Sequence, residues 1–75
     1  MKIRAVFAEN LRRVRKERDI SQEELAHRAG LDRTYISSLE RQVYAASIDV
    51  VDRLADVLDV YPSDLLLTKS QRRNA

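Results

Sequence analysis

The chain has 75 residues, of which 44% are hydrophobic and 35% charged, with one glycine, one proline and no cysteine. That length fits one small domain with a modest core and leaves no room for a separate catalytic domain. The composition is that of a folded protein with few turn-forming residues, so we expect a mostly helical chain. The lack of cysteine excludes disulfides, thiolate metal sites and a cysteine nucleophile.

The net charge of +2 hides a segregation along the sequence. Residues 1–41 carry ten Lys or Arg and seven Asp or Glu, residues 42–67 carry one Arg and five Asp, and the last eight carry three basic residues. A polyanion would therefore meet the first half or the tail. From composition alone, an excess this small is more typical of an ordinary solvated surface, so it indicates DNA binding only if a motif lies in the basic half.

The first predicted helix runs from about residue 3 to residue 18. Phe7, Leu11, Val14 and Arg18 recur there at the spacing of one helical face. Arg4 and Glu9 interrupt any apolar run that could serve as a secretory signal peptide. No apolar stretch of the sequence is long enough to cross a bilayer. We therefore expect a cytoplasmic protein without a membrane partner.

The second predicted helix covers about residues 22–29 and ends at the only glycine. Ser21 is placed to cap its start, with Glu24 at the matching position of a capping box. Gly30 can take the left-handed conformation that ends a helix without a Cβ penalty. The chain is expected to turn there.

The third predicted helix follows at about residues 33–41. Asp32 is its N-cap, and its buried face holds Ile36, Leu39 and Glu40, with Val43 as a further candidate. Two short helices joined by a tight turn are typical of the helix-turn-helix motif that binds DNA.

The remaining segments complete an all-α, compact bundle of five helices. Ser47 caps a fourth helix whose predicted buried face consists of Ile48, Val51, Leu54, Ala55 and Leu58. Pro62 suits the first turn of a last short helix. Residues 1–67 thus form a single domain, and residues 68–75 are polar and expected to be disordered.

The stretch SQEELAHRAGLDRTYISSLER, residues 21–41, resembles the helix-turn-helix of the lambda-repressor-like, Cro-type family, also called the xenobiotic response element family. The resemblance follows the register Q-x-x-L-A-x-x-x-G-(x)5-I-x-x-x-E, which is filled by Gln22, Leu25, Ala26, Gly30, Ile36 and Glu40. It continues through SIDVVDRLADVLDVYPSDLL and covers about residues 7–67. It implies a transcriptional regulator, repressor or autoregulator, of bacterial, phage or plasmid origin that binds double-stranded DNA. The small single-domain form also resembles the controller proteins of restriction-modification systems.

The sequence departs from the family in the loop after the third helix. Family members commonly have a glycine at the position of Gln42 and a proline at that of Ala46. The third helix therefore either ends near Arg41 or extends further. Exposed Val43, Tyr44 and Ala45 in this loop are also candidates for a protein contact.

Several residues are candidates for DNA contacts. In the recognition helix, Thr34, Ser38 and Arg41 follow one stripe, and Arg33 and Ser37 form the neighbouring row. Arg33 can donate two hydrogen bonds to guanine O6 and N7. The other candidates are Gln22, on a phosphate as the resemblance implies; Tyr35, on a thymine methyl or a phosphate; and Arg41 and Tyr44, on phosphates. A polar stripe alone is more often solvated surface, but the motif around this one favours the DNA-binding interpretation.

Arg15 and Glu40 lie at the edges of apolar faces, where an unpaired charge would be costly. Spacing alone allows either Arg15 or Arg18 to pair with Glu40, and the family resemblance favours Arg15. The predicted role of this salt bridge is structural, linking the first helix to the recognition helix.

A homodimer on an inverted-repeat operator is expected, because one recognition helix contacts only a few base pairs. The resemblance implies dimerisation through the last helices, where the candidates are Tyr61, Leu65, Leu66 and Leu67, with at least one leucine in the core. No cofactor, metal or small-molecule effector is expected: His27, the only histidine, has no partner at metal-ligand spacing, and no effector domain is present.

Two other classes of function fit the sequence less well. An antitoxin or another protein-interaction module on the same fold is the alternative, although the polar tail is a poor toxin-binding segment. An enzyme is not expected, because one histidine, no cysteine, no phosphate-cradling glycine loop and no convergent carboxylates leave no catalytic set.

Overall fold

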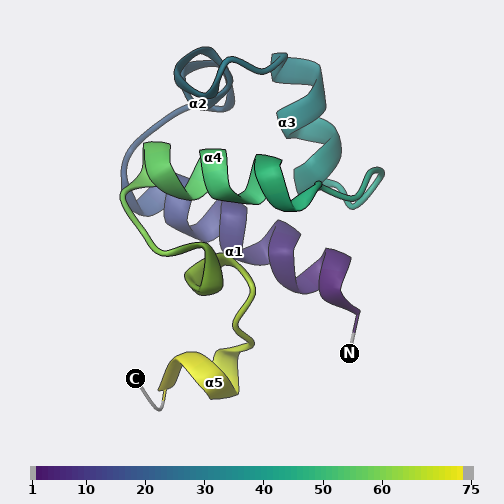
Figure 1. Ribbon diagram of the computed structural model, residues 1–75, viewed down its shortest axis with the longest axis vertical. Helices are drawn as coiled ribbons and strands as arrows, with labels where there is room; N and C mark the ends of the chain where they lie inside the picture. The colour runs from purple at the N-terminus through teal and green to yellow at the C-terminus, as the bar shows by residue number, and fades with distance from the viewer. Residues whose placement is uncertain (1, 74–75) are drawn as a thin grey trace.

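The computed structural model describes residues 2–73, which contain helices and no strand. The elements are α1 (Ile3–Glu17), α2 (Gln22–Ala29), α3 (Arg33–Glu40), α4 (Ile48–Leu58), the short 3-10 helix η1 (Pro62–Leu65) and α5 (Lys69–Arg73). In Figure 1, α2 and α3 form the upper end, α1 and α4 cross the middle, and α5 lies at the lower end. The expected all-α helical fold is confirmed. None of the described helices is long and apolar enough to span a membrane.

Three of the predicted N-caps begin helices as expected. The side chains of Ser21, Asp32 and Ser47 accept hydrogen bonds from backbone N–H groups two or three residues ahead, at 3.0, 2.8 and 3.1 Å. Each bond satisfies a donor that the first helical turn leaves without a partner. The starts of α2, α3 and α4 are therefore fixed by local chemistry.

Within residues 2–73, four turns use the left-handed backbone conformation, and only one of them is at glycine. Gly30 has φ of 68°, and Asp19, Gln42 and Asp59 have φ of 57°, 65° and 58°. In each turn the next residue donates its N–H back to a carbonyl five positions earlier, as in Val60 to Ala55 at 3.0 Å. This is the bond that closes a Schellman cap. Gln42 does so where the family commonly has glycine, so α3 does not extend beyond Arg41.

The core lies between α1, α2, α3, α4 and η1, each of which contributes buried apolar side chains. α1 and α4 run in the same direction (Figure 1), and at their C-terminal ends Arg18 Nε donates to the carbonyl of Leu58 at 2.8 Å. The buried apolar residues include Phe7, Leu11, Val14, Leu25, Ile36, Leu39, Leu54, Leu58 and Leu65.

The prediction that Ile48 is buried is wrong, because its side chain is 87% exposed. Ile48 is the first residue of α4 and stands three residues before Val51, which is buried. The two share a helical face, but Ile48 extends that face beyond the edge of the core.

The C-terminal segment is fastened by Asn10, a polar residue of α1 that the sequence did not single out. Its side chain is 2% exposed and donates to the carbonyls of Leu65 at 3.0 Å and Leu67 at 2.8 Å. After this anchor, Thr68 caps α5, which occupies part of the tail that was expected to be disordered. In the structure α5 covers residues 69–73 of this tail, and residues 74–75 lie outside the described residues.

Candidate nucleic-acid interface

The turn between α2 and α3 is built around Gly30. With φ of 68° and ψ of 34°, Gly30 ends α2, and the N–H of Leu31 donates back to the carbonyl of Ala26 at 2.8 Å. Leu31 packs against the core, and Asp32 then begins α3. As Figure 1 shows, α3 runs in a different direction from α2. The predicted turn role of Gly30 is confirmed.

The outward face of α3 is polar and carries two arginines. Ile36 and Leu39 are buried, whereas Arg33, Thr34 and the C-cap Arg41 are exposed and Ser37 is half-buried. Thr34, Ser37 and Arg41 stand at i, i+3 and i+7, which places them in one row.

Ser38 does not belong to that row. Its side chain is only 4% exposed, so the expectation that it faces DNA is wrong. The left-handed turn at Gln42 folds the chain back, and the N–H of Val43 donates to the carbonyl of Ser38 at 2.9 Å.

The same loop brings together the two tyrosines that were predicted to contact DNA. The ring centroids of Tyr35 and Tyr44 lie 6.4 Å apart, within the range of an aromatic pair. Tyr35 is half-buried and Tyr44 is exposed. Both lie beside the outward face of α3, at its loop side.

Arg15 and Glu40 form the predicted salt bridge. Arg15 Nε lies 2.7 Å from Glu40 Oε2, and Arg15 Nη2 donates to Glu40 Oε1 at 3.0 Å. Arg15 Nη1 also donates to the carbonyl of Ile20 at 2.9 Å, so the guanidinium has partners on three sides. Arg18, the alternative partner, instead donates to the carbonyls of Leu58 and Asp59.

Gln22 joins this pair, which the sequence did not show. Its Nε2 donates to Glu40 Oε1 at 3.1 Å, so Glu40 connects the first residue of α2 with α1 and α3. We call Arg15, Glu40 and Gln22 the Glu40 network. A primary amide has two N–H donors, and this bond uses one of them. Gln22 and Glu40 stand eighteen residues apart in the motif, but the motif alone does not indicate a direct contact between them.

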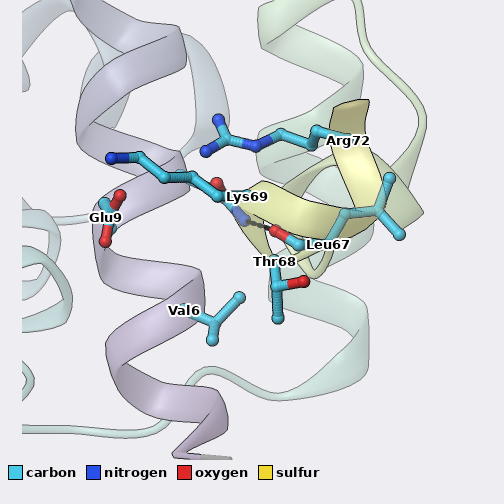
Figure 2. Close-up of a pocket in the computed structure, with 7 residues that line it drawn as sticks. Val6, Glu9, Leu67, Thr68, Lys69 and Arg72 are labelled. Carbon is cyan, nitrogen blue, oxygen red and sulfur yellow. Dashed lines mark hydrogen bonds between the residues drawn. The ribbon is translucent and has the colours of Figure 1, made fainter. Parts of the chain in front are cut away.

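The basic residues of the tail lie far from this face. Lys69 belongs to α5, at the opposite end of the molecule from α2 and α3 in Figure 1. Figure 2 shows Lys69 and Arg72 over a shallow pocket of about 220 Å³ against Glu9 of α1. The basic residues of α5 are therefore not part of the surface that α3 forms.

The structure separates the residues that were predicted to form a dimer interface. Leu65 is fully buried, so its assignment to an interface is wrong and it belongs to the core. Tyr61 is 77% exposed, Leu66 is 37% exposed, and Leu67 is half-buried. Tyr61 shares a groove with Arg18 and Asp59, at the C-terminal ends of α1 and α4.

The described part of the chain offers no metal-binding cluster. Within residues 2–73, no three His, Cys, Asp or Glu side chains are grouped to hold an ion, and His27 is exposed on α2.

Comparison with known proteins also identifies a helix-turn-helix protein. The helix-turn-helix family HTH_3 matches residues 11–65. A hypothetical transcription factor from Neisseria meningitidis is 41% identical over 70 residues, which are 93% of this chain and 66% of that protein. The chain thus spans about two thirds of that relative's length. The control protein C.BamHI from Bacillus amyloliquefaciens is 40% identical over 85% of this chain and 80% of its own length.

Solved structures agree with these matches. The crystal structure of the Neisseria factor has a TM-score of 0.93 at 40% identity, covering 97% of this chain and 84% of that one. The biofilm regulator SinR, in a crystal structure in complex with DNA, has a TM-score of 0.78 at 35% identity, covering 81% of this chain and 98% of that one. The Neisseria relative is named a hypothetical transcription factor, C.BamHI a control protein and SinR a regulator, and none of these names is that of an enzyme. The chain belongs to the helix-turn-helix family of transcriptional regulators.

Proposed function

We propose that this protein binds an inverted-repeat operator as a homodimer and regulates transcription with α3 in the major groove. The outward row of Thr34, Ser37 and Arg41, with Arg33 beside it, is the observation that carries this proposal. The Glu40 network supports it, because it ties the start of α2 and the end of α3 to α1 in one arrangement. A reading helix of this kind has to be held in place by its neighbours.

In this proposal each polar side chain has a distinct role. Arg33 donates two bonds to a guanine, which is worth about 1–3 kcal/mol of discrimination. Thr34 and Ser37 contact neighbouring base edges through short hydroxyl groups. Arg41, at the end of the helix, binds a phosphate.

Phosphate contacts at both sides of α3 fix its register. Gln22 has a second amide N–H beyond the one given to Glu40, and it stands at the N-terminus of α2, where free backbone N–H groups favour an anion. On the loop side, the hydroxyl of exposed Tyr44 reaches a second phosphate, and its ring supports Tyr35 against the duplex. Ser38, being buried, has no part in the contact.

Two copies are needed for useful specificity. One helix contacts only a few base pairs, whereas a two-fold dimer places two recognition helices about 34 Å apart on one face of the duplex. The likeness to C.BamHI, which is named a control protein, supports a regulatory role. We propose that the protein is an autoregulator whose occupancy of DNA follows its own concentration. No cofactor or small-molecule effector takes part.

The test is selection of binding sites from a random duplex library by the wild-type protein and by Arg33→Ala. The wild type is expected to enrich an inverted repeat with a guanine in each half-site, and Arg33→Ala to lose the preference at that guanine. Arg72→Ala, an arginine variant on the far side of the molecule, is the matched control and should enrich the wild-type site.

A contact with phosphate leaves a different signature from one with a base. On the selected duplex, Arg41→Ala should weaken binding about equally for all sequences and lower the slope of log affinity against log salt by about one. If the library stays unenriched at low salt, the proposal fails. A protein-interaction module is then the second candidate, supported by Val43 and Tyr44, which are exposed in the loop after α3.

A further inference from the structure

A groove with three basic side chains runs along the outer side of α1, next to the C-terminal end of α3. It has a volume of about 450 Å³, and its lining includes Arg12, Arg13 and Lys16 of α1 together with Glu40 and Gln42 at and just after the end of α3. We call it the α1 groove. The operator contacts proposed above use none of its three basic residues.

Two of these three cations are free to bind an anion. Arg12 and Lys16 are exposed, and neither has an ion-pair partner within 4.0 Å among the described residues. Arg13, in contrast, is paired with Glu17 at 3.2 Å. Arg12 and Lys16 stand at i and i+4, so they lie on the same face of α1.

The carboxylates of the groove do not cancel this charge. Glu40 is already neutralised within the Glu40 network, where both of its oxygens accept hydrogen bonds. Glu9 lies at the border of the groove toward α5, because it also lines the pocket below Lys69 and Arg72 (Figure 2). The α1 groove therefore carries a net positive charge.

The α1 groove lies between two residues that are proposed above to bind phosphates. At one end, a second hollow beside Lys16 extends to Ser21, the N-cap directly before Gln22. At the other end, Gln42 directly follows Arg41. A duplex that contacts both Gln22 and Arg41 is therefore brought next to this side of α1.

We infer that α1 is a second part of the DNA interface, with Arg12 and Lys16 on two neighbouring phosphates of the strand that passes the start of α2. The inference rests on the proposed function, in which α3 occupies the major groove. The two residues are about 6 Å apart along the helix axis, which is within two nucleotide steps of about 3.4 Å on one strand. Such contacts carry no base information, but they fix the register of the protein on the duplex.

The charge on the rest of the surface favours the same orientation. The exposed outer side of α4 has a single arginine, Arg53, and four carboxylates. The carboxylates are those of Asp49, Asp52, Asp56 and Asp59. A duplex that extended from α3 over α4 would meet charge of its own sign, whereas one that extends over α1 meets the cations of the α1 groove.

The first experiment measures the affinity for the selected duplex as a function of salt concentration. Arg12→Gln and Lys16→Gln each remove one exposed charge and keep a residue of similar helix propensity, so circular dichroism should be unchanged. Each variant is expected to lower the slope of log affinity against log salt by about 0.9, and the double variant by about twice as much. The base preferences should remain those of the wild type, because α3 is untouched.

Arg53→Gln is the matched control for these variants. It removes the same charge from an exposed arginine, but Arg53 stands among the carboxylates of α4. The slope should therefore remain that of the wild-type protein.

The second experiment locates the contact on the DNA. A set of duplexes is made in which one phosphate at a time, along the strand that passes α2, is replaced by an uncharged methylphosphonate. The wild-type protein is expected to lose affinity at two adjacent positions beside the phosphate of Gln22. Arg12→Gln should lose no further affinity at one of these positions, because the interaction is already absent. A variant that acted only through the folding of α1 would be weakened at both positions as much as the wild type.

The outcomes separate this inference from the proposed function. If Arg12→Gln and Lys16→Gln change the salt slope no more than Arg53→Gln does, or if every methylphosphonate weakens them as much as the wild type, the assignment of α1 is overturned while that of α3 stands. A wild-type protein that enriches no duplex at low salt overturns both.

Discussion

Arg15 of α1 and Glu40 of α3 hold each other by two short bonds, 2.7 and 3.0 Å long, with side chains that are only 11% and 5% exposed. Removing two charges from water costs more than their attraction returns unless the remaining donors and acceptors are satisfied. The carbonyl of Ile20 and the amide of Gln22 supply those extra partners. The pair therefore acts chiefly to fix the position of α3 against α1 and α2.

Removing one member of this pair should be strongly destabilising. Glu40→Ala leaves the Arg15 guanidinium buried without its carboxylate, and we expect a loss of about 3 kcal/mol in the free energy of unfolding. Urea denaturation followed by circular dichroism measures it. Glu17→Ala is the matched control, since Glu17 forms an exposed i,i+4 pair with Arg13 and its loss should cost less than about 1 kcal/mol. Equal losses for the two variants would contradict the account.

Gly30 should be sensitive to substitution for a reason of backbone conformation alone. A Cβ added there would meet no atom within 4 Å, but φ of 68° is unfavourable for a residue with a side chain. Gly30→Ala should therefore lower the free energy of unfolding by about 1–2 kcal/mol. Gly30→Asn should lose less, because asparagine tolerates the left-handed region. The conformational explanation is wrong if urea denaturation shows the alanine variant to be as stable as the wild type.

Asn10 should matter for the C-terminal segment more than for the rest of the fold. Asn10→Ala leaves the carbonyls of Leu65 and Leu67 without their donor, and we expect a loss of about 1–3 kcal/mol. Amide hydrogen exchange should quicken at residues 65–72 before it changes in α2 and α3.

Asn10→Asp separates the hydrogen bonds from the packing of this side chain. The aspartate has nearly the same shape but would place carboxylate oxygens against two carbonyl oxygens, so it should be at least as destabilising as alanine. An aspartate variant as stable as the wild type would show that the two bonds contribute nothing.

Local chemistry explains why much of the fold could be predicted from the sequence. Ser21, Asp32 and Ser47 are caps that act on the next few residues, and Gly30 is required by one backbone conformation. Such signals do not depend on the rest of the molecule. The Arg15–Glu40 pair was different, because periodicity allowed two arginines and only the family resemblance chose between them.

The wrong predictions concern residues whose burial depends on the packing of other segments or on where the core ends. Helical spacing placed Ser38 on an outer stripe, but its side chain is buried in the fold. The same spacing placed Ile48 on the buried face of α4, without showing that the core ends before it. Gln42 takes a left-handed backbone conformation, which its residue type alone does not predict. These features depend on tertiary context, which periodicity does not contain.

The central claim is that two copies present two α3 helices to one face of the duplex. The spacing of the two half-sites tests this claim most directly. The affinity of the wild-type protein would be measured on the selected inverted repeat, on the same repeat with about half a helical turn inserted at its centre, and on a single half-site. The account predicts that the insertion lowers the affinity to that of the single half-site, because it turns the second half-site to the opposite face. Equal affinity for the original and the lengthened repeat would mean that the copies bind independently, and would contradict it.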